Sequence, residues 1–207
     1  MIYIILLAAG NSRRFQREGS PRPVNKLLYP FSGKPLFLHS FERWRQAADM
    51  AGDCRVLAVS REPKILEAAG GLGFSPIESP DSEKGISYSI RAGIEGAAFG
   101  KADNFHPSDR LVFSVSDQPF LEVRTLNAFL KEAKENRYTC LTWKGEWYNP
   151  VSFPPEAVWE LLELRGDQGG KKVLRNHQKE LRQVEAWREE EIKDVDFPKD
   201  MDVLGGK

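Results

Sequence analysis

Cysteine and histidine are scarce in this chain of 207 residues. It has two cysteines, Cys54 and Cys140, and three histidines, His39, His106 and His177. These residues are scattered along the chain and match no spacing of zinc ligands. We therefore expect no zinc site, and we expect both thiols to be reduced.

The chain also lacks net charge and any long hydrophobic run. Thirty basic residues balance thirty acidic ones, so no global positive field would attract nucleic acid or an anionic membrane. The apolar run at 2–9 has no basic residue before it and stops after about eight positions, well short of the roughly 20 that span a bilayer. We expect a cytoplasmic protein with no nucleic acid and no membrane as partner.

Apolar residues are plentiful and are arranged as in an α/β protein. They make up 41% of the chain, which predicts a single domain over residues 1–207. Short β-branched and aliphatic runs at 2–7, 55–59 and 110–115 indicate strands buried in a mostly parallel sheet. Each is followed by helical spacing, and the predicted helices are 35–48, 63–69, 87–99, 123–136, 155–164 and a short one after 169. Loops are predicted at 10–25, 76–85 and 101–108.

The loop after the first strand is strongly basic. Residues 13–34 contain six cations and one carboxylate in a chain of zero net charge. The small residues Ala8, Ala9 and Gly10 let backbone N–H groups approach a ligand, and the cations suit phosphate oxygens. Neither a P-loop nor a three-glycine dinucleotide motif is present. The pattern indicates an anion site after the first strand, with a solvated basic loop as the alternative.

A second signal is Asp117, which follows the predicted strand 110–115 and precedes Pro119. Ligands of open parallel sheets bind at the carboxyl ends of the strands, so Asp117 would face the basic loop. A carboxylate beside a polyphosphate is repulsive unless a hard cation lies between them, which predicts Mg²⁺. A turn former or helix cap is the alternative role for Asp117, and an exposed turn is the alternative for a second acidic pair, Asp194 and Asp196.

Three further segments have the composition of ligand loops. Gly85, Ser87 and Ser89 open a helix whose N-terminal N–H groups suit a nucleotide, although Ser87 is equally suited to be a helix cap. The segments 148–153 and 165–172 read as substrate-facing loops. The second of these is glycine-rich with paired lysines and would suit an acceptor phosphate, although it would also serve as a connector between helices.

Taken together, these segments resemble the nucleotidyltransferases that build dinucleotide forms of the molybdenum cofactor, and most closely the molybdenum cofactor cytidylyltransferases. The family's motifs match in order at 7–14 (Leu-Ala-Ala-Gly-Asn-Ser-Arg-Arg), 26–28 (Lys-Leu-Leu), 33–36 (Gly-Lys-Pro-Leu), 85–90, 117–119 (Asp-Gln-Pro), 166–171 and 194–200. The resemblance implies a Rossmann-like three-layer α/β/α fold with a mostly parallel sheet. It implies transfer of CMP from CTP to the phosphate of molybdopterin, release of pyrophosphate, and transient contact with a molybdenum hydroxylase apoenzyme that receives the product.

The resemblance also implies roles for individual residues. Arg14 and Lys26 would bind the triphosphate, and Asp117 would hold Mg²⁺ with Asp194 or Asp196. The nucleotide-binding residues would be Leu7, Ala8, Ala9, Gly10, Arg14, Lys26, Gly85, Ser87 and Ser89. The acceptor-binding residues would be Asn149, Asp167, Gly169 and Lys171. No Ser-His-Asp or Cys-His arrangement is needed, because an ionised acceptor phosphate attacks without a strong base.

The chain departs from the family mainly in the acceptor segments. Tyr148-Asn149 replaces Gly-His, Gly170-Lys171 replaces Ala-Arg, and lysine cannot reproduce the bidentate grip of arginine on phosphate. Another small phosphorylated acceptor, such as a sugar phosphate, with CTP or GTP as donor, is therefore an alternative. A catalytically silent nucleotide-binding chaperone of a molybdenum hydroxylase is a further one. For the donor, Ala9 stands where guanylyl members tend to carry glycine, and its methyl group would crowd a purine.

Overall fold

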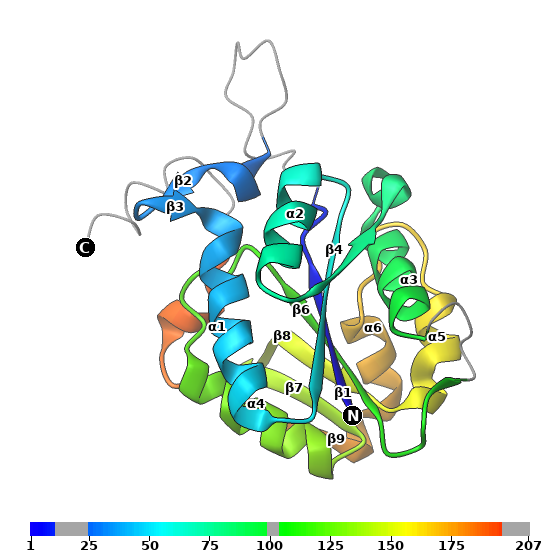
Figure 1. Cartoon of the computed structure of the whole chain (residues 1–207). Coiled ribbons are helices and arrows are strands. Elements are labelled where there is room, and N and C mark those ends of the chain that lie inside the picture. Colours follow the sequence, from blue (N-terminus) through cyan, green and yellow to red (C-terminus); the bar gives the residue numbers. More distant parts are fainter. Residues whose placement is uncertain (11–24, 99–103, 196–207) are drawn as a thin grey trace.

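A seven-stranded sheet forms the centre of the computed structural model, which describes residues 1–10, 25–98 and 104–195 (Figure 1). In order across the sheet, the strands are β5 (Ser75–Glu78), β4 (Cys54–Ser60), β1 (Ile2–Leu7), β6 (Arg110–Val115), β8 (Glu146–Phe153), β7 (Tyr138–Trp143) and β9 (Leu181–Glu185). A separate two-stranded ribbon joins β2 (Pro30–Phe31) and β3 (Lys34–Pro35). The predicted mostly parallel sheet is thus confirmed.

The strand order reverses between β1 and β6. The chain builds β4 and then β5 on one side of β1, and afterwards returns to place β6 on the other side, with all four strands parallel. The remaining strands extend the sheet beyond β6, and β8 runs antiparallel to both of its neighbours. Ligands of such sheets bind where the order reverses, outside the carboxyl ends of the strands.

Helices cover both faces of the sheet (Figure 1). Because neighbouring strand residues point to opposite faces, Ile4 and Leu6 of β1 pack in one apolar cluster and Ile5 and Leu7 in another. The first cluster is covered by α1 (Leu36–Ala51), α2 (Pro63–Gly71) and α4 (Val123–Glu135); the second is covered by α3 (Ile86–Ala97), α5 (Val158–Leu162) and α6 (Lys171–Leu174). This is the expected three-layer α/β/α arrangement.

The predicted helices lie close to the observed ones, and short 3-10 helices complete the connections. The 3-10 helices are η2 (Lys26–Leu28), η3 (Pro80–Lys84), η5 (Pro155–Ala157), η6 (Arg175–Glu180) and η7 (Glu189–Ile192). The helix predicted over 155–164 begins as η5 and continues as α5. Over the described ranges, no helix combines the length and apolarity that crossing a membrane requires.

Two predicted loops are wrong in part because they contain strands. The segment 76–85 overlaps β5, which among the described strands pairs only with β4 and, as an edge strand, tolerates Pro76. The segment 148–153 belongs to β8, where the pairing with β7 shifts between Cys140 and Leu141. Asn149 and Pro150 fall at this shift, so the proline removes no regular ladder hydrogen bond.

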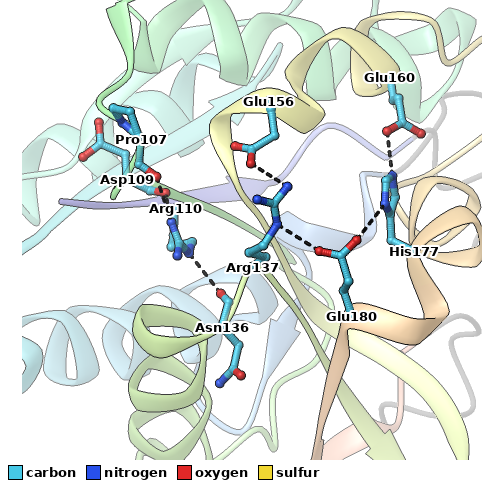
Figure 2. A network of polar contacts seen from close by, with 9 residues as sticks. All are labelled: Pro107, Asp109, Arg110, Asn136, Arg137, Glu156, Glu160, His177 and Glu180. Carbon is cyan, nitrogen blue, oxygen red and sulfur yellow. Dashed lines mark hydrogen bonds and ion pairs between the residues drawn. The ribbon is translucent and has the colours of Figure 1, made fainter.

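A network of charged side chains joins η5, α5 and η6 on the side of the sheet that α3 covers (Figure 2). The Arg137 guanidinium contacts Glu156 at 2.6 Å and Glu180 at 3.0 Å. The Nε2 atom of His177 lies 2.6 Å from Glu160 Oε1. The segment that follows α6 is thereby tied to α5 and to the start of β7.

Candidate active site

A cavity of about 190 Å³ opens at the carboxyl ends of β1 and β6, where the strand order reverses. The two strand ends are joined there, because Ser116 N–H donates to the Leu7 carbonyl at 3.2 Å. The lining residues are Leu7, Ala9, Gly10, Lys26, Leu27, Ser82, Gly85, Ile86, Ser89, Val115, Ser116, Asp117 and Asp167. The cavity therefore contains most of the described residues that the sequence predicted to bind the nucleotide.

Lys26 and Asp117 form an ion pair in this cavity. Lys26 begins η2, and Asn25 caps that turn by accepting a hydrogen bond from Leu27 N–H at 3.1 Å. Only 8% of Lys26 is exposed, and its Nζ atom lies 2.7 Å from Asp117 Oδ2. The structure thus brings together two predicted catalytic residues that are 91 positions apart in the sequence.

The second oxygen of Asp117 makes the site suitable for a hard cation. Asp117 Oδ1 is buried and has no hydrogen-bond partner among the described residues. No cluster of three or more His, Cys, Asp or Glu side chains in the described part of the chain is arranged to hold a metal ion. One available carboxylate oxygen fits a magnesium ion that is held mainly by substrate phosphates and water.

Gly85 brings the start of α3 against the loop that carries Asp167. Its φ is +130°, and a Cβ atom at this position would lie 2.2 Å from the Gly166 carbonyl carbon. Ser87 N–H donates to the Gly166 carbonyl at 3.0 Å. Only a residue without a side chain permits this approach, which sets the start of α3 at the cavity wall.

Two predicted nucleotide-binding residues lie behind the cavity lining. Ala8 is 1% exposed, and its N–H donates to the Val59 carbonyl at 2.8 Å. Ser87 is 3% exposed and does not line the cavity, whereas Ser89, further along α3, does. Ala8 and Ser87 therefore support the cavity wall through backbone hydrogen bonds.

Ser82 and Ser116 line the cavity but were not predicted from the sequence. Both hydroxyl groups are buried and have no hydrogen-bond partner within the described residues. Buried polar atoms are usually paired, so these hydroxyls are suited to contact a polar ligand. Ser116 directly precedes Asp117, so its place at the site could have been predicted from the sequence. Ser82 lies in a segment predicted as an ordinary loop.

A second cavity of about 460 Å³ adjoins the first. Its lining includes all four predicted acceptor residues, and the full set is Leu7, Ile86, Ile90, Phe113, Asn149, Val151, Asp167, Gln168, Gly169, Gly170, Lys171, Lys172 and Arg175. Leu7, Ile86 and Asp167 line both cavities. A ligand in one cavity would therefore lie next to a ligand in the other.

The second cavity is cationic. Lys171, Lys172 and Arg175 line it, and among the described residues of its lining Asp167 is the only carboxylate. Burial lowers the pKa of Lys171, and the nearby Asp194 acts in the opposite direction. Such a surface suits an anionic group such as a phosphate ester.

Of the remaining predicted residues, Asp194 is the one that the structure describes. Asp194 is exposed, and the N–H of the next residue, Val195, donates to the Asp117 carbonyl at 3.0 Å. The C-terminal acidic segment therefore reaches the Asp117 backbone. Arg14 and Asp196 lie outside the described residues.

The doubly wound fold and the matching family model place the chain in a class of protein, the α/β nucleotidyltransferases. The chain belongs to the MobA-like NTP transferase domain family, whose match covers residues 4–182. It is accordingly a nucleotidyltransferase that uses a nucleoside triphosphate. No curated protein matches the sequence significantly.

Several solved structures share the fold. A nucleotidyl transferase from Methanothermobacter thermautotroptrophicus is 21% identical, with a TM-score of 0.77 over 100% of this chain and 96% of its own. Rv0371c from Mycobacterium tuberculosis is 20% identical, with a TM-score of 0.73 over 100% and 98% of the two chains, and it has also been solved as a complex with manganese. CMP:2-keto-3-deoxy-manno-octonic acid synthetase complexed with CTP is 15% identical, with a TM-score of 0.68 over 99% and 97%. At sequence identities this low, the structural similarity shows only that the fold is shared.

Proposed function

We propose that this enzyme transfers CMP from CTP to the phosphate of the molybdenum-pterin cofactor, releasing pyrophosphate and forming molybdopterin cytosine dinucleotide. The observation that carries the proposal is the pair of adjoining cavities, one holding Lys26 and Asp117 and the other lined by cations. The matching motifs of the molybdenum cofactor cytidylyltransferases support the choice of acceptor, and the CTP complex of a structural neighbour supports the choice of donor.

In this proposal the first cavity binds the nucleotide. The backbone at Ala9 and Gly10 and the start of α3 enclose the nucleoside, while Lys26, together with Arg14, binds the triphosphate. Asp117 holds Mg²⁺ with a contribution from Asp194 or Asp196, and the manganese complex of Rv0371c supports a divalent metal. When bound, this ion neutralises charge on the triphosphate and the leaving pyrophosphate.

The second cavity would hold the acceptor, with Asn149, Asp167, Gly169 and Lys171 around it. An oxygen of the acceptor phosphate forms a bond to the α-phosphorus of CTP as the bond between the α-phosphorus and the bridging oxygen to the β-phosphate breaks. The acceptor phosphate is already ionised at neutral pH, so no side chain has to remove a proton. Lys26 stays on the phosphates throughout, and most of the rate comes from positioning and charge neutralisation.

One observation favours a different phosphorylated acceptor. A Cβ atom at Gly170, where the resembling family carries alanine, would lie 3.0 and 3.1 Å from two ring carbons of Phe153. The acceptor loop therefore approaches β8 more closely than a side chain would allow without movement. Since this loop differs from that of the resembling family, another phosphorylated acceptor, such as a sugar phosphate, is the second candidate.

A substrate matrix tests the proposal. Each of the four nucleoside triphosphates is offered with the molybdenum-pterin cofactor, with sugar 1-phosphates and without acceptor, and pyrophosphate release is measured together with the product mass. We expect CTP with the molybdenum-pterin cofactor to give the highest rate. A higher rate with a sugar phosphate would support the second candidate, and nucleotide binding without pyrophosphate from any pair would indicate a silent nucleotide-binding protein that attends a molybdenum hydroxylase.

A further inference from the structure

The segment that follows β9 holds both ends of the loop that begins with Asp117. At one end, Val195 N–H donates to the Asp117 carbonyl at 3.0 Å. At the other end, Glu122 N–H donates to Glu191 Oε1 at 3.3 Å. In Figure 1 this segment is the orange-red end of the described chain, beside the first turn of α4. Residues 117–122 are thereby clamped by residues 191–195.

Glu191 is the buried anchor of this clamp. Its side chain is 0% exposed, and its carboxylate also accepts hydrogen bonds from the Thr125 hydroxyl at 2.9 Å and from Trp187 N–H at 2.9 Å. Three donors thus converge on one carboxylate, which offsets the cost of its burial.

The clamp also replaces a missing local cap. Glu122 is the N-cap residue of α4, yet its side chain makes no capping hydrogen bond. Free N–H groups at a helix start favour a negative charge, and Glu191 supplies it from a segment 69 positions away. The start of α4 and the end of the Asp117 loop are fixed at the same point.

Apolar packing makes the clamp rigid. Val195 is 0% exposed and Leu121 is 2% exposed, and both belong to the apolar cluster that α1 and α4 cover. Movement of the segment at Glu191 would therefore be passed to the Asp117 backbone, since Ile192, next to Glu191, and Val195 pack against the same core.

We propose that Glu191 is a positioning residue for Asp117: by anchoring residues 191–195 on the first turn of α4, it fixes the Asp117 carboxylate for Lys26 and for the metal ion. This inference rests on the proposed function, because it gives Asp117 a metal to hold. Groups that hydrogen-bond directly to a metal ligand change metal affinity or activity about 10- to 100-fold when they are altered, and we expect the lower end of this range because Glu191 acts on Asp117 through the backbone.

The test compares Glu191→Gln with Glu190→Gln, an exposed position on the same 3-10 helix. Three quantities are measured: hydrogen exchange of the metal-free protein at residues 117–125 and 187–195, Mn²⁺ binding by electron paramagnetic resonance, and steady-state kinetics. For Glu191→Gln we expect faster exchange in both segments, a dissociation constant for Mn²⁺ raised about tenfold, and a kcat lowered about tenfold with KM for the nucleotide changed by less than about threefold. The Glu190→Gln control should match the wild type.

A purely structural role for Glu191 would lower stability without these shifts. Mn²⁺ binding and kcat of Glu191→Gln within about twofold of the wild type, despite faster exchange, would overturn the inference. If that variant does not fold, Thr125→Val removes one donor to the Glu191 carboxylate, and the same readouts should shift in the same direction by a smaller factor. No shift in Thr125→Val would then overturn the inference.

The wild type and Asp117→Asn are measured alongside. If the wild type releases no pyrophosphate, or if Asp117→Asn binds Mn²⁺ as the wild type does, the proposed function itself fails. If both behave as proposed and only the Glu191 variant is unaffected, the positioning role alone is wrong.

Discussion

The ion pair of Lys26 and Asp117 is the residue-scale feature on which the account depends. Only 8% of Lys26 is exposed, so its charge lies largely in the protein interior. Electrostatic interactions are stronger there than in water. Lys34, another cation of the same basic stretch, pairs with Glu42 outside the cavity. Two lysines close in sequence thus have different environments.

This difference yields the first prediction. Lys26→Met should lower kcat/KM by about 10²- to 10³-fold, because it removes a preorganised positive charge from the phosphates. Lys34→Met serves as the matched control and should stay within about threefold of the wild type, since its partner Glu42 lies outside the cavity. Pyrophosphate release under initial-rate conditions measures both; equal losses in the two variants would contradict the role given to Lys26.

Ala9 provides a prediction about the base. It lines the cavity proposed to bind the nucleotide and is 7% exposed, so in this proposal its methyl group would occupy space that a purine needs. Ala9→Gly should raise the ratio of GTP to CTP turnover by about tenfold, the size expected for one methyl group in a tight pocket. An unchanged ratio would remove Ala9 from the discrimination between bases.

At the scale of elements, the contact between the start of α3 and the loop at Gly166 shapes the wall shared by the two cavities. Gly85→Ala should reduce the free energy of unfolding by about 2 to 3 kcal/mol, because the new methyl group meets backbone atoms and the φ of +130° is strained for alanine. Gly71→Ala, at a position with no atom within 4 Å of the added methyl group, should change it by less than about 1 kcal/mol. Urea unfolding compares the two, and a Gly85→Ala variant as stable as Gly71→Ala would refute the close approach.

The contact between α5 and η6 makes stability depend on pH. Burial alone would raise the pKa of Glu160, but the hydrogen bond from His177 (Figure 2) and a further one from Asn176 outweigh it, so the pKa lies below its usual value. A carboxyl group with a lowered pKa stabilises the folded state above its unfolded pKa of about 4.3, and this stabilisation is lost as the pH falls through the folded value.

The corresponding experiment uses Glu160→Gln. The wild type should be more stable than this variant at pH near 7 by about 1 kcal/mol or less, because 36% of the side chain is exposed and solvent screens the pair. The difference should become smaller at about pH 3, because protonation of the Glu160 carboxyl in the folded state removes this stabilisation as the pH falls. Urea unfolding at the two pH values measures it, and a difference that persists undiminished at low pH would contradict the pairing.

Sequence patterns predicted the elements whose periodicity is strong and missed those whose pattern is broken. The buried strand β1 and the helices α1 and α4 have unbroken apolar patterns that predict them. Strands β5 and β8 contain Pro76 and Pro150, which argue against a strand, and only the position of each residue in the sheet accommodates them. The four-residue β5 also exposes alternate residues, which removes the apolar signal.

The part of the candidate site that lies directly after the strand ends could be predicted from the sequence. Asp117 and the loop at Ala9 follow buried strands, so their meeting at one edge of the sheet follows from the fold class. Ser82 depends on how η3 folds against the cavity, and Glu191 depends on a contact with α4 from far along the chain. Contacts of this kind between distant segments produce no local sequence pattern from which they could be predicted.

For the whole molecule, the doubly wound sheet explains why two ligand cavities adjoin. The cavity that contains Lys26 and Asp117 forms at the reversal between β1 and β6, and the antiparallel β8 beyond β6 places Asn149 at the neighbouring cavity. Asp167 lines both cavities from the loop ahead of α6. In the proposed reaction, donor and acceptor would therefore lie side by side, as group transfer requires.

The most direct test of this account is the rate of pyrophosphate release from CTP and the molybdenum-pterin cofactor, as a function of Mg²⁺ concentration, for the wild type and Asp117→Asn. We predict that Asp117→Asn, which keeps the shape of the side chain but removes its charge, lowers kcat by about 100-fold or more and raises the Mg²⁺ concentration needed for half-maximal rate. Undiminished activity with an unchanged Mg²⁺ dependence would contradict the claim that Asp117 and Lys26 together hold a metal-bound triphosphate.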